Sequence, residues 1–214
     1  GVAEVPPAGN VADTLDDDWL DIQNGRAWLA LAEAWGSGAR SEALRSACDG
    51  APGTGFACLH DAGSWFRIRQ LGIPVLLKLH GDMPRMLLLR GFSKEHVLVG
   101  HADSGREVER GEIEQRWLGE FVIAWPQAPD WPAQIRRGDT GPAVDIVMQM
   151  AALVDKPWQG EGDFDEAFED WLVAFQRSRG LDADGIIGPN TLIHLMSPTI
   201  DEPRLLMDTE GEGG

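Results

Sequence analysis

The sequence predicts an α+β domain with an antiparallel sheet, followed by a small domain of three helices. Apolar residues recur at helical spacing between residues 25 and 71, and strand-like apolar runs then fill residues 74–125. A segment with three prolines, residues 125–132, interrupts both patterns, and helical spacing returns after it. Helices followed by strands indicate an α+β arrangement, because a parallel sheet requires the two to alternate.

The helices of the N-terminal piece are expected over residues 25–35, 41–47 and 64–71. The first places Trp28, Leu31 and Trp35 on one face. Ser41 and Ser64 are candidate N-caps for the other two, because a serine hydroxyl can accept a bond from a free amide of the first turn.

The strands are expected over residues 74–79, 85–89, 96–100 and 121–125. Gly91, Gly100 and Gly105 separate them as turn residues. A short helical turn is expected over residues 112–118, before the last strand.

The proline-rich segment sets the domain boundaries. We expect an N-terminal domain over residues 16–126, a linker over 127–134, and a C-terminal domain over 135–196. The ends, residues 1–15 and 197–214, are expected to be flexible or peripheral. Within the C-terminal domain the predicted helices cover residues 142–153, 165–179 and 190–196.

The net charge excludes some classes of function. It is −17, and both nucleic acids and anionic lipid surfaces require a basic partner. The strongest apolar runs, residues 73–79 and 86–89, are too short to span a bilayer. Because the chain opens with Gly1 and has no signal-like apolar region, it is expected to be part of a longer protein.

The C-terminal piece carries an ordered series of landmarks: glycines at 138 and 141 in the opening segment, Phe175-Gln176, Gly180-Leu181, and Asp-Gly-Ile-Ile-Gly-Pro-Asn-Thr-Leu at 184–192. This series resembles the small three-helix peptidoglycan-binding domain found on many bacterial cell-wall hydrolases. One departure lies at residues 160–167. The family pattern here is Gly-x-Phe-Gly-x-x-Thr, and this chain lacks the Gly that follows the Phe and the Thr that ends the pattern.

A groove for a glycan or a peptide needs hydrogen-bonding groups beside an apolar wall. The polar candidates near the turns of this piece are Arg136, Arg137, Asp139, Gln176 and Asp184. The alternative is that the Asp-Gly-x-x-Gly-x-x-Thr residues mainly hold the fold.

The N-terminal piece resembles the cysteine peptidases that cleave double-glycine leader peptides in bacteriocin exporters, which have a papain-like fold. The resemblance rests on residues 25–36, on the runs 71–79 and 86–89, and on the late Trp117-Leu-Gly119. The nucleophile position falls at about Gln23 or Asn24, the His position near Arg85, and the Asp-Pro near His101-Ala102. Since none is the required residue, we expect a peptidase-like domain that is not an enzyme.

The two cysteines, Cys48 and Cys58, flank a loop rich in Gly and Pro. A disulfide between them fits an oxidising compartment. Two free thiols in a cytosolic chain, or a catalytic Cys58 with His60, are the alternatives.

Neither a metal nor a cofactor is expected. The five histidines lack HExxH spacing, and no GxxxxGK[ST] motif is present. His96 and His101 are expected to be surface or turn residues, and Asp16–Asp18 is interpreted as a helix-capping acidic run.

The order of these parts resembles the periplasmic region of the general secretion pathway protein A family (ExeA type) of type II secretion. Members carry an upstream ATPase domain and a membrane helix that these residues lack. The resemblance implies a non-enzymatic periplasmic scaffold that binds peptidoglycan. It would pair with the B protein of the pathway and help position the outer-membrane secretin, directly or indirectly.

Two other functions stay open. One is an active cell-wall or peptide hydrolase with a wall-targeting module. The other is a protein-interaction module without wall binding, in which a Trp-bearing surface serves partners or self-association. The simpler expectation for the tryptophans 28, 35, 65 and 117 is that they lie in the core.

Overall fold

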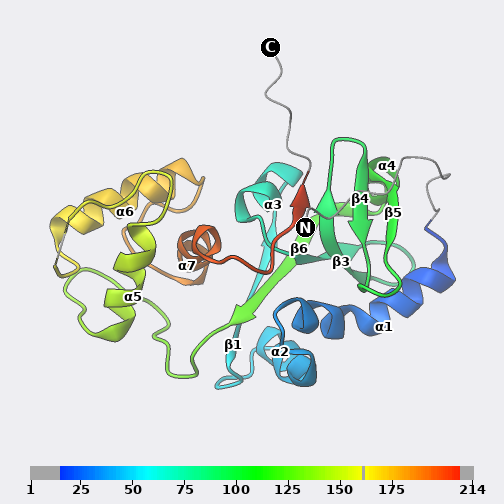
Figure 1. Cartoon of the computed structure of the whole chain (residues 1–214), viewed down its shortest axis with the longest axis horizontal. Coiled ribbons are helices and arrows are strands. Elements are labelled where there is room, and N and C mark those ends of the chain that lie inside the picture. Colours follow the sequence, from blue (N-terminus) through cyan, green and yellow to red (C-terminus); the bar gives the residue numbers. More distant parts are fainter. Residues whose placement is uncertain (1–14, 161, 208–214) are drawn as a thin grey trace, which may run out of the picture.

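The computed structural model describes residues 15–160 and 162–207. Figure 1 shows a sheet domain with α1 and α2 beneath it, and a separate group of helices formed by α5, α6 and α7. The α+β class with an antiparallel sheet, followed by a helical domain, is therefore confirmed.

Helix α1 (Asp17–Ala34) begins eight residues before the predicted start. The Asp16 side chain accepts a bond of 2.7 Å from the Trp19 amide, and Asp17 and Asp18 follow in the first turn. This is the capping role expected of the acidic run. A bond from Arg106 to Asp16, together with the bond from the Trp19 amide, holds the pKa of this carboxyl below its usual value.

The other helices of this domain are short: α2 (Ser41–Cys48), α3 (Trp65–Leu71) and α4 (Arg110–Glu114). Ser41 is the first residue of α2 and not its cap, and the Ser64 side chain makes no capping bond to α3. Gly72 ends α3 at φ 63°, a left-handed conformation that costs glycine little.

A seven-stranded sheet is formed by the described residues, in the order β1-β6-β2-β3-β4-β5, with β7 added beside β3. Its strands are β1 (Phe56–Ala62), β2 (Val75–Leu79), β3 (Arg85–Phe92), β4 (His96–Val99), β5 (Arg106–Glu109), β6 (Trp117–Pro126) and β7 (Leu206–Met207). All pairs are antiparallel except the short parallel pair of β3 with β7.

The sheet is covered on both faces. Along β2, Val75 and Leu77 face one core with Trp65 and Trp117, whereas Leu76 faces a second core with Leu31. A strand buried on both faces is almost wholly apolar, which explains the continuous run of residues 73–77. Trp65 and Trp117 are core residues, as expected, and Trp28 and Trp35 are partly buried.

The helical domain consists of α5 (Pro142–Ala151), α6 (Glu166–Ser178) and α7 (Pro189–Met196). Its core contains Val144 and Val147 from α5 with Phe168 and Leu172 from α6, at the predicted spacing. Ile135 pairs with Ile187, so the segment before α5 lies alongside the turn before α7.

The chain returns to the N-terminal domain after α7. Residues 197–207 form a 3₁₀ turn (Ser197–Thr199) and then β7, and Leu205 is buried in the N-terminal core. The Leu205 amide donates to the Gly72 carbonyl at 2.9 Å. The expectation of a flexible or peripheral end is therefore wrong for residues 197–207, while residues 1–14 and 208–214 lie outside the described chain.

Candidate functional site

The turn between α6 and α7 is organised around Gln176, whose side chain is fully buried. Its Nε2 lies within hydrogen-bond distance of three oxygens: Asp184 Oδ1 at 2.9 Å, the Ile186 carbonyl at 3.0 Å and Thr191 Oγ1 at 3.1 Å. Its Oε1 accepts from the Gly185 amide at 2.9 Å. Gln176 is one of the candidate ligand residues, and in this structure its buried side chain holds the turn together.

Asp184 belongs to the same turn but is exposed to solvent. Its Oδ1 also accepts from the Ile186 amide at 2.9 Å, so this oxygen serves the turn, but the residue as a whole is exposed. It borders a groove of about 190 Å³. The groove runs along the turn 181–191, with Gln134 of the linker and Leu59 of β1 on its sides.

Three further candidates lie on the segment that pairs with this turn. Arg136 and Arg137 are exposed, and Arg137 forms an ion pair of 3.1 Å with Glu169 of α6. The Asp139 carboxylate accepts from the Arg136 amide at 2.9 Å, which closes a local turn. These three residues do not line the groove beside Asp184.

The positions that the sequence aligned with peptidase residues lie on α1 or contact it. Gln23 is buried, and its Oε1 accepts from the His101 amide at 2.8 Å. The neighbouring Asn24 accepts from the Met86 amide at 2.7 Å, at the start of β3. Arg85, one residue earlier, pairs with Asp21 at 2.6 Å and Asp17 at 3.3 Å. Gln23, Asn24, Arg85 and His101 therefore all lie within residues 17–24 of α1 or bond to them.

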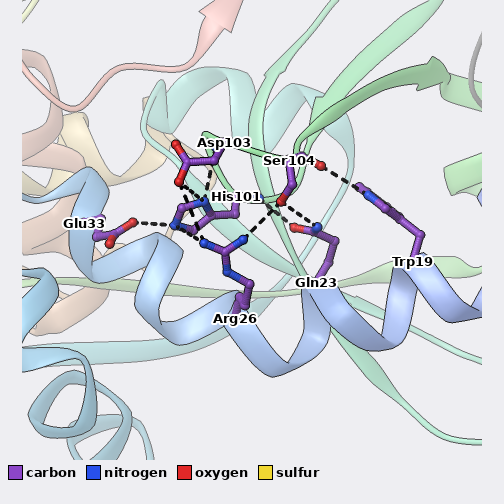
Figure 2. A network of polar contacts seen from close by, with 7 residues as sticks. All are labelled: Trp19, Gln23, Arg26, Glu33, His101, Asp103 and Ser104. Carbon is purple, nitrogen blue, oxygen red and sulfur yellow. Dashed lines mark hydrogen bonds and ion pairs between the residues drawn. The ribbon is translucent and has the colours of Figure 1, made fainter.

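His101 was expected to be a surface or turn residue. It lies at a turn after β4, but it is only 4% exposed and lies in a polar network against α1 (Figure 2). The Asp103 amide donates to Nδ1 at 3.2 Å, which leaves the ring hydrogen on Nε2, 2.6 Å from Glu33 Oε2. Arg26 lies 3.2 Å from the same nitrogen.

The rest of the network joins the loop 101–105 to α1. The Ser104 hydroxyl receives bonds from Gln23 Nε2 at 3.1 Å and from Arg26 at 3.3 Å, and Trp19 donates to the Ser104 carbonyl. Among the described residues, no hydrogen bond joins this hydroxyl to an imidazole, as an activated nucleophile requires. Sequence reasoning missed this network, although its helical members, Trp19, Gln23, Arg26 and Glu33, follow helical spacing.

The two cysteines form the expected disulfide, Cys48–Cys58, which links the end of α2 to β1. The free-thiol alternative is therefore wrong. The alternative of a catalytic Cys58 with His60 fails for the same reason, because a disulfide sulfur is not a thiolate nucleophile. His60 instead contacts the Cys48 carbonyl at 3.2 Å.

Sequence comparison matches residues 154–195 to the family described as "putative peptidoglycan binding domain". General secretion pathway protein A of Aeromonas hydrophila is 28% identical over 189 residues, covering 85% of this chain and 33% of that protein. A putative general secretion pathway protein A of Escherichia coli (strain K12) is 22% identical, covering 91% of this chain and 40% of that protein. The chain thus spans between a third and two fifths of these curated relatives.

Among solved structures, a periplasmic domain of the EpsAB fusion protein of the Vibrio vulnificus type II secretion system shares the fold. Its TM-score is 0.58 at 20% identity, over 82% of this chain and 78% of that one. The peptidase domain of Streptococcus ComA aligns with 54% of this chain at a TM-score of 0.39. In the described part of the chain, no helix is long and apolar enough to cross a membrane. The chain is thus similar in sequence to general secretion pathway protein A, and residues 154–195 of its helical domain match the peptidoglycan-binding family.

Proposed function

We propose that this chain is a non-enzymatic periplasmic scaffold that binds peptidoglycan in association with type II secretion. The observation that carries the proposal is the match of residues 154–195 to the peptidoglycan-binding family, on a helical domain with an accessible groove. The similarity to general secretion pathway protein A along 85% of the chain supports the link to secretion.

The groove of the wall ligand is the one beside the turn 181–191. It combines the apolar walls of Leu59 and Leu181 with the polar groups of Gln134 and Asp182, the mixture that glycan and peptide ligands require. Asp184 serves it indirectly, because the same carboxylate fixes the shape of the turn. Arg136 and Arg137 extend the polar surface next to it.

The N-terminal domain acts as a structural and interaction module and not as a peptidase. At the aligned nucleophile position an amide, Gln23, binds the backbone of His101, so the side chains that would perform catalysis here hold α1 to a loop. The disulfide fits the oxidising periplasm. This scaffold pairs with the B protein of the pathway and helps to position the outer-membrane secretin, directly or indirectly.

The test is retention of the full chain, residues 1–214, on purified peptidoglycan sacculi after sedimentation. The wild-type chain should sediment with sacculi, and the double variant Gln134→Ala/Asp182→Ala should bind about tenfold more weakly, because it removes two polar contacts of the groove. Asp170→Ala is the matched control, since it removes an exposed carboxylate on α6 that does not line this groove.

Failure of the wild-type chain to sediment would contradict wall binding. Equal retention of the double variant and the control would place the ligand elsewhere. Cleavage of peptidoglycan or of a double-glycine leader peptide by the wild-type chain would contradict the non-enzymatic role.

A further inference from the structure

A second cleft, of about 530 Å³, lies where the two domains meet, and three arginines line it. Arg69 comes from α3 of the N-terminal domain, Arg179 from the end of α6, and Arg204 from the segment that returns to the sheet. Both domains and the C-terminal return therefore contribute to one cavity, separate from the groove at residues 181–191.

The charge of this cleft is opposite to that of the whole chain. Asp155 is the one acidic residue lining it, and it pairs with Arg179 at 2.7 Å. Arg69 lies over the ring of Phe92, 5.2 Å from its centroid, and is half-buried. Within residues 15–160 and 162–207, neither Arg69 nor Arg204 has a carboxylate partner within 4.0 Å, although the chain carries a net charge of −17.

Arg179 lines the cleft with a largely covered side chain. Its side chain is 15% exposed, and its Nε is buried without a hydrogen-bond partner among the described residues. Buried donors without a partner are rare in folded proteins, because the lost hydration is not recovered. The pKa of His194 on α7 is lowered to about 4, first by burial and then by the positive charges of Arg67 and Arg179.

Such a cleft selects acceptors that carry negative charge. The guanidinium group presents a planar fork of donors that matches the two oxygens of a carboxylate. Arg69 and Arg204, which lack a carboxylate partner among the described residues, supply two such forks, while the apolar side chains of Leu71 and Leu205 line the remaining wall.

We propose that this interdomain cleft binds a ligand with at least two carboxylates and that, on the basis of the proposed wall-binding function, this ligand is the stem peptide of peptidoglycan. The stem peptide carries free carboxylates on its glutamate and diaminopimelate residues. These residues are small enough to enter a cleft of about 530 Å³. Peptidoglycan would then contact the protein at two separate points, the groove beside the turn 181–191 and the interdomain cleft.

The test is calorimetric titration of the full chain with the tripeptide L-Ala-γ-D-Glu-meso-diaminopimelate. We expect the fully amidated tripeptide to bind at least about tenfold more weakly, because its carboxylates are gone. Arg69→Gln and Arg204→Gln should each weaken binding of the acid form by about tenfold. Arg45→Gln, which removes an exposed arginine of α2 outside the cleft, should leave it unchanged.

Equal binding of the acid and amidated tripeptides would overturn the proposal, and this comparison needs no variant that could misfold. Unchanged binding by both arginine variants would also overturn it. Inorganic phosphate is the third probe, and a phosphate affinity equal to that of the tripeptide would overturn the stem-peptide assignment.

The outcome is separable from the sacculus experiment. If sacculi fail to retain the chain but the tripeptide binds through Arg69 and Arg204, the wall-binding function fails and the dicarboxylate site stands. If sacculi retain the chain and the tripeptide does not bind, the cleft assignment alone fails.

Discussion

Gln176 shows how one buried amide can determine the shape of a turn. Its side chain contacts four groups between residues 184 and 191, one of which is the Gly185 amide. Replacement by alanine removes all of these bonds, and each buried polar group that is left unpaired costs about 1–3 kcal/mol. We expect Gln176→Ala to lower the free energy of unfolding by about 3 kcal/mol, measured by urea denaturation. Gln134→Ala, at an exposed position, should change it by less than about 0.5 kcal/mol.

His194 makes stability depend on pH in a defined window. Its pKa is lowered from 6.5 to about 4 by burial and by the charges of Arg67 and Arg179, so the folded protein keeps it neutral. Below pH 6.5 the unfolded chain binds a proton that the folded chain does not, and this favours unfolding. The contribution is therefore complete above pH 6.5 and is lost progressively as the pH falls toward 4.

We expect wild-type stability to fall by about 2 kcal/mol more than that of His194→Gln between pH 7 and pH 5. Urea denaturation at both pH values measures this difference, because the carboxylates titrate alike in the two proteins. Parallel pH profiles would show that His194 is protonated as readily in the folded chain as in the unfolded one.

At the scale of residues, the sequence predicted the disulfide correctly. It did not predict which polar side chains tertiary contacts would bury. The pairing of Cys48 with Cys58 followed from the cysteine count and the loop between them. Gln176 was named as a candidate ligand residue and His101 as a surface or turn residue, and the burial of both side chains was not predicted. Their partners, Thr191 for Gln176 and Glu33 for His101, lie 15 and 68 residues away, a separation that local pattern does not encode.

At the scale of elements, the disulfide joins α2 to an edge strand. Cys48 and Cys58 are ten residues apart, and closing a loop of this length restricts the unfolded chain by about 2–3 kcal/mol. We expect dithiothreitol to lower the free energy of unfolding by this amount. The double variant Cys48→Ala/Cys58→Ala should be destabilised similarly and should not respond to the reductant. A reductant effect on the double variant would mean that the effect does not come from this bond.

Gly91 allows β7 to reach the sheet. A Cβ at this position would lie 2.5 Å from the Leu206 carbonyl oxygen and 2.8 Å from its Cβ, so one of the two strands must move. We expect Gly91→Ala to detach β7 and to speed hydrogen exchange of the Leu205 amide, which is bonded to Gly72. Gly111→Ala is the control, because nothing lies within 4 Å of its added methyl. Unchanged exchange in Gly91→Ala would mean that the strands shift without separating.

The strands found from sequence are those with continuous apolar runs, and the strands missed are those at edges. β2, β3, β4 and the core of β6 each face buried side chains, which gives them their pattern. β5 buries only Val108 between charged residues, and β7 has two residues. Edge strands are commonly short or charged, because such edges resist pairing with another chain, and this weakens their apolar pattern.

At the scale of the whole molecule, the helical domain is inserted between two strands of one sheet. β6 precedes it and β7 follows it, so both of its ends lead into the N-terminal domain. The domains also share contacts, because Ile193 of α7 is buried in the N-terminal core and Arg67 of α3 donates to Asn190 at 3.2 Å. This topology could not be derived from the proline-rich linker, which indicated two pieces joined end to end.

Because the helical domain is inserted, we expect the stability of the N-terminal domain to depend on residues 197–207, which follow the helical domain. A chain that ends at residue 196 loses the buried Leu205, its bond to Gly72 and the pairing of β7 with β3. Loss of one buried leucine costs about 2–5 kcal/mol, so we expect this chain to unfold at clearly lower urea than a chain that ends at residue 207. Trp65 and Trp117 lie in the affected core, so their fluorescence reports the transition. Equal urea midpoints of the two chains would mean that the N-terminal domain is complete at β6 and gains no stability from residues 197–207.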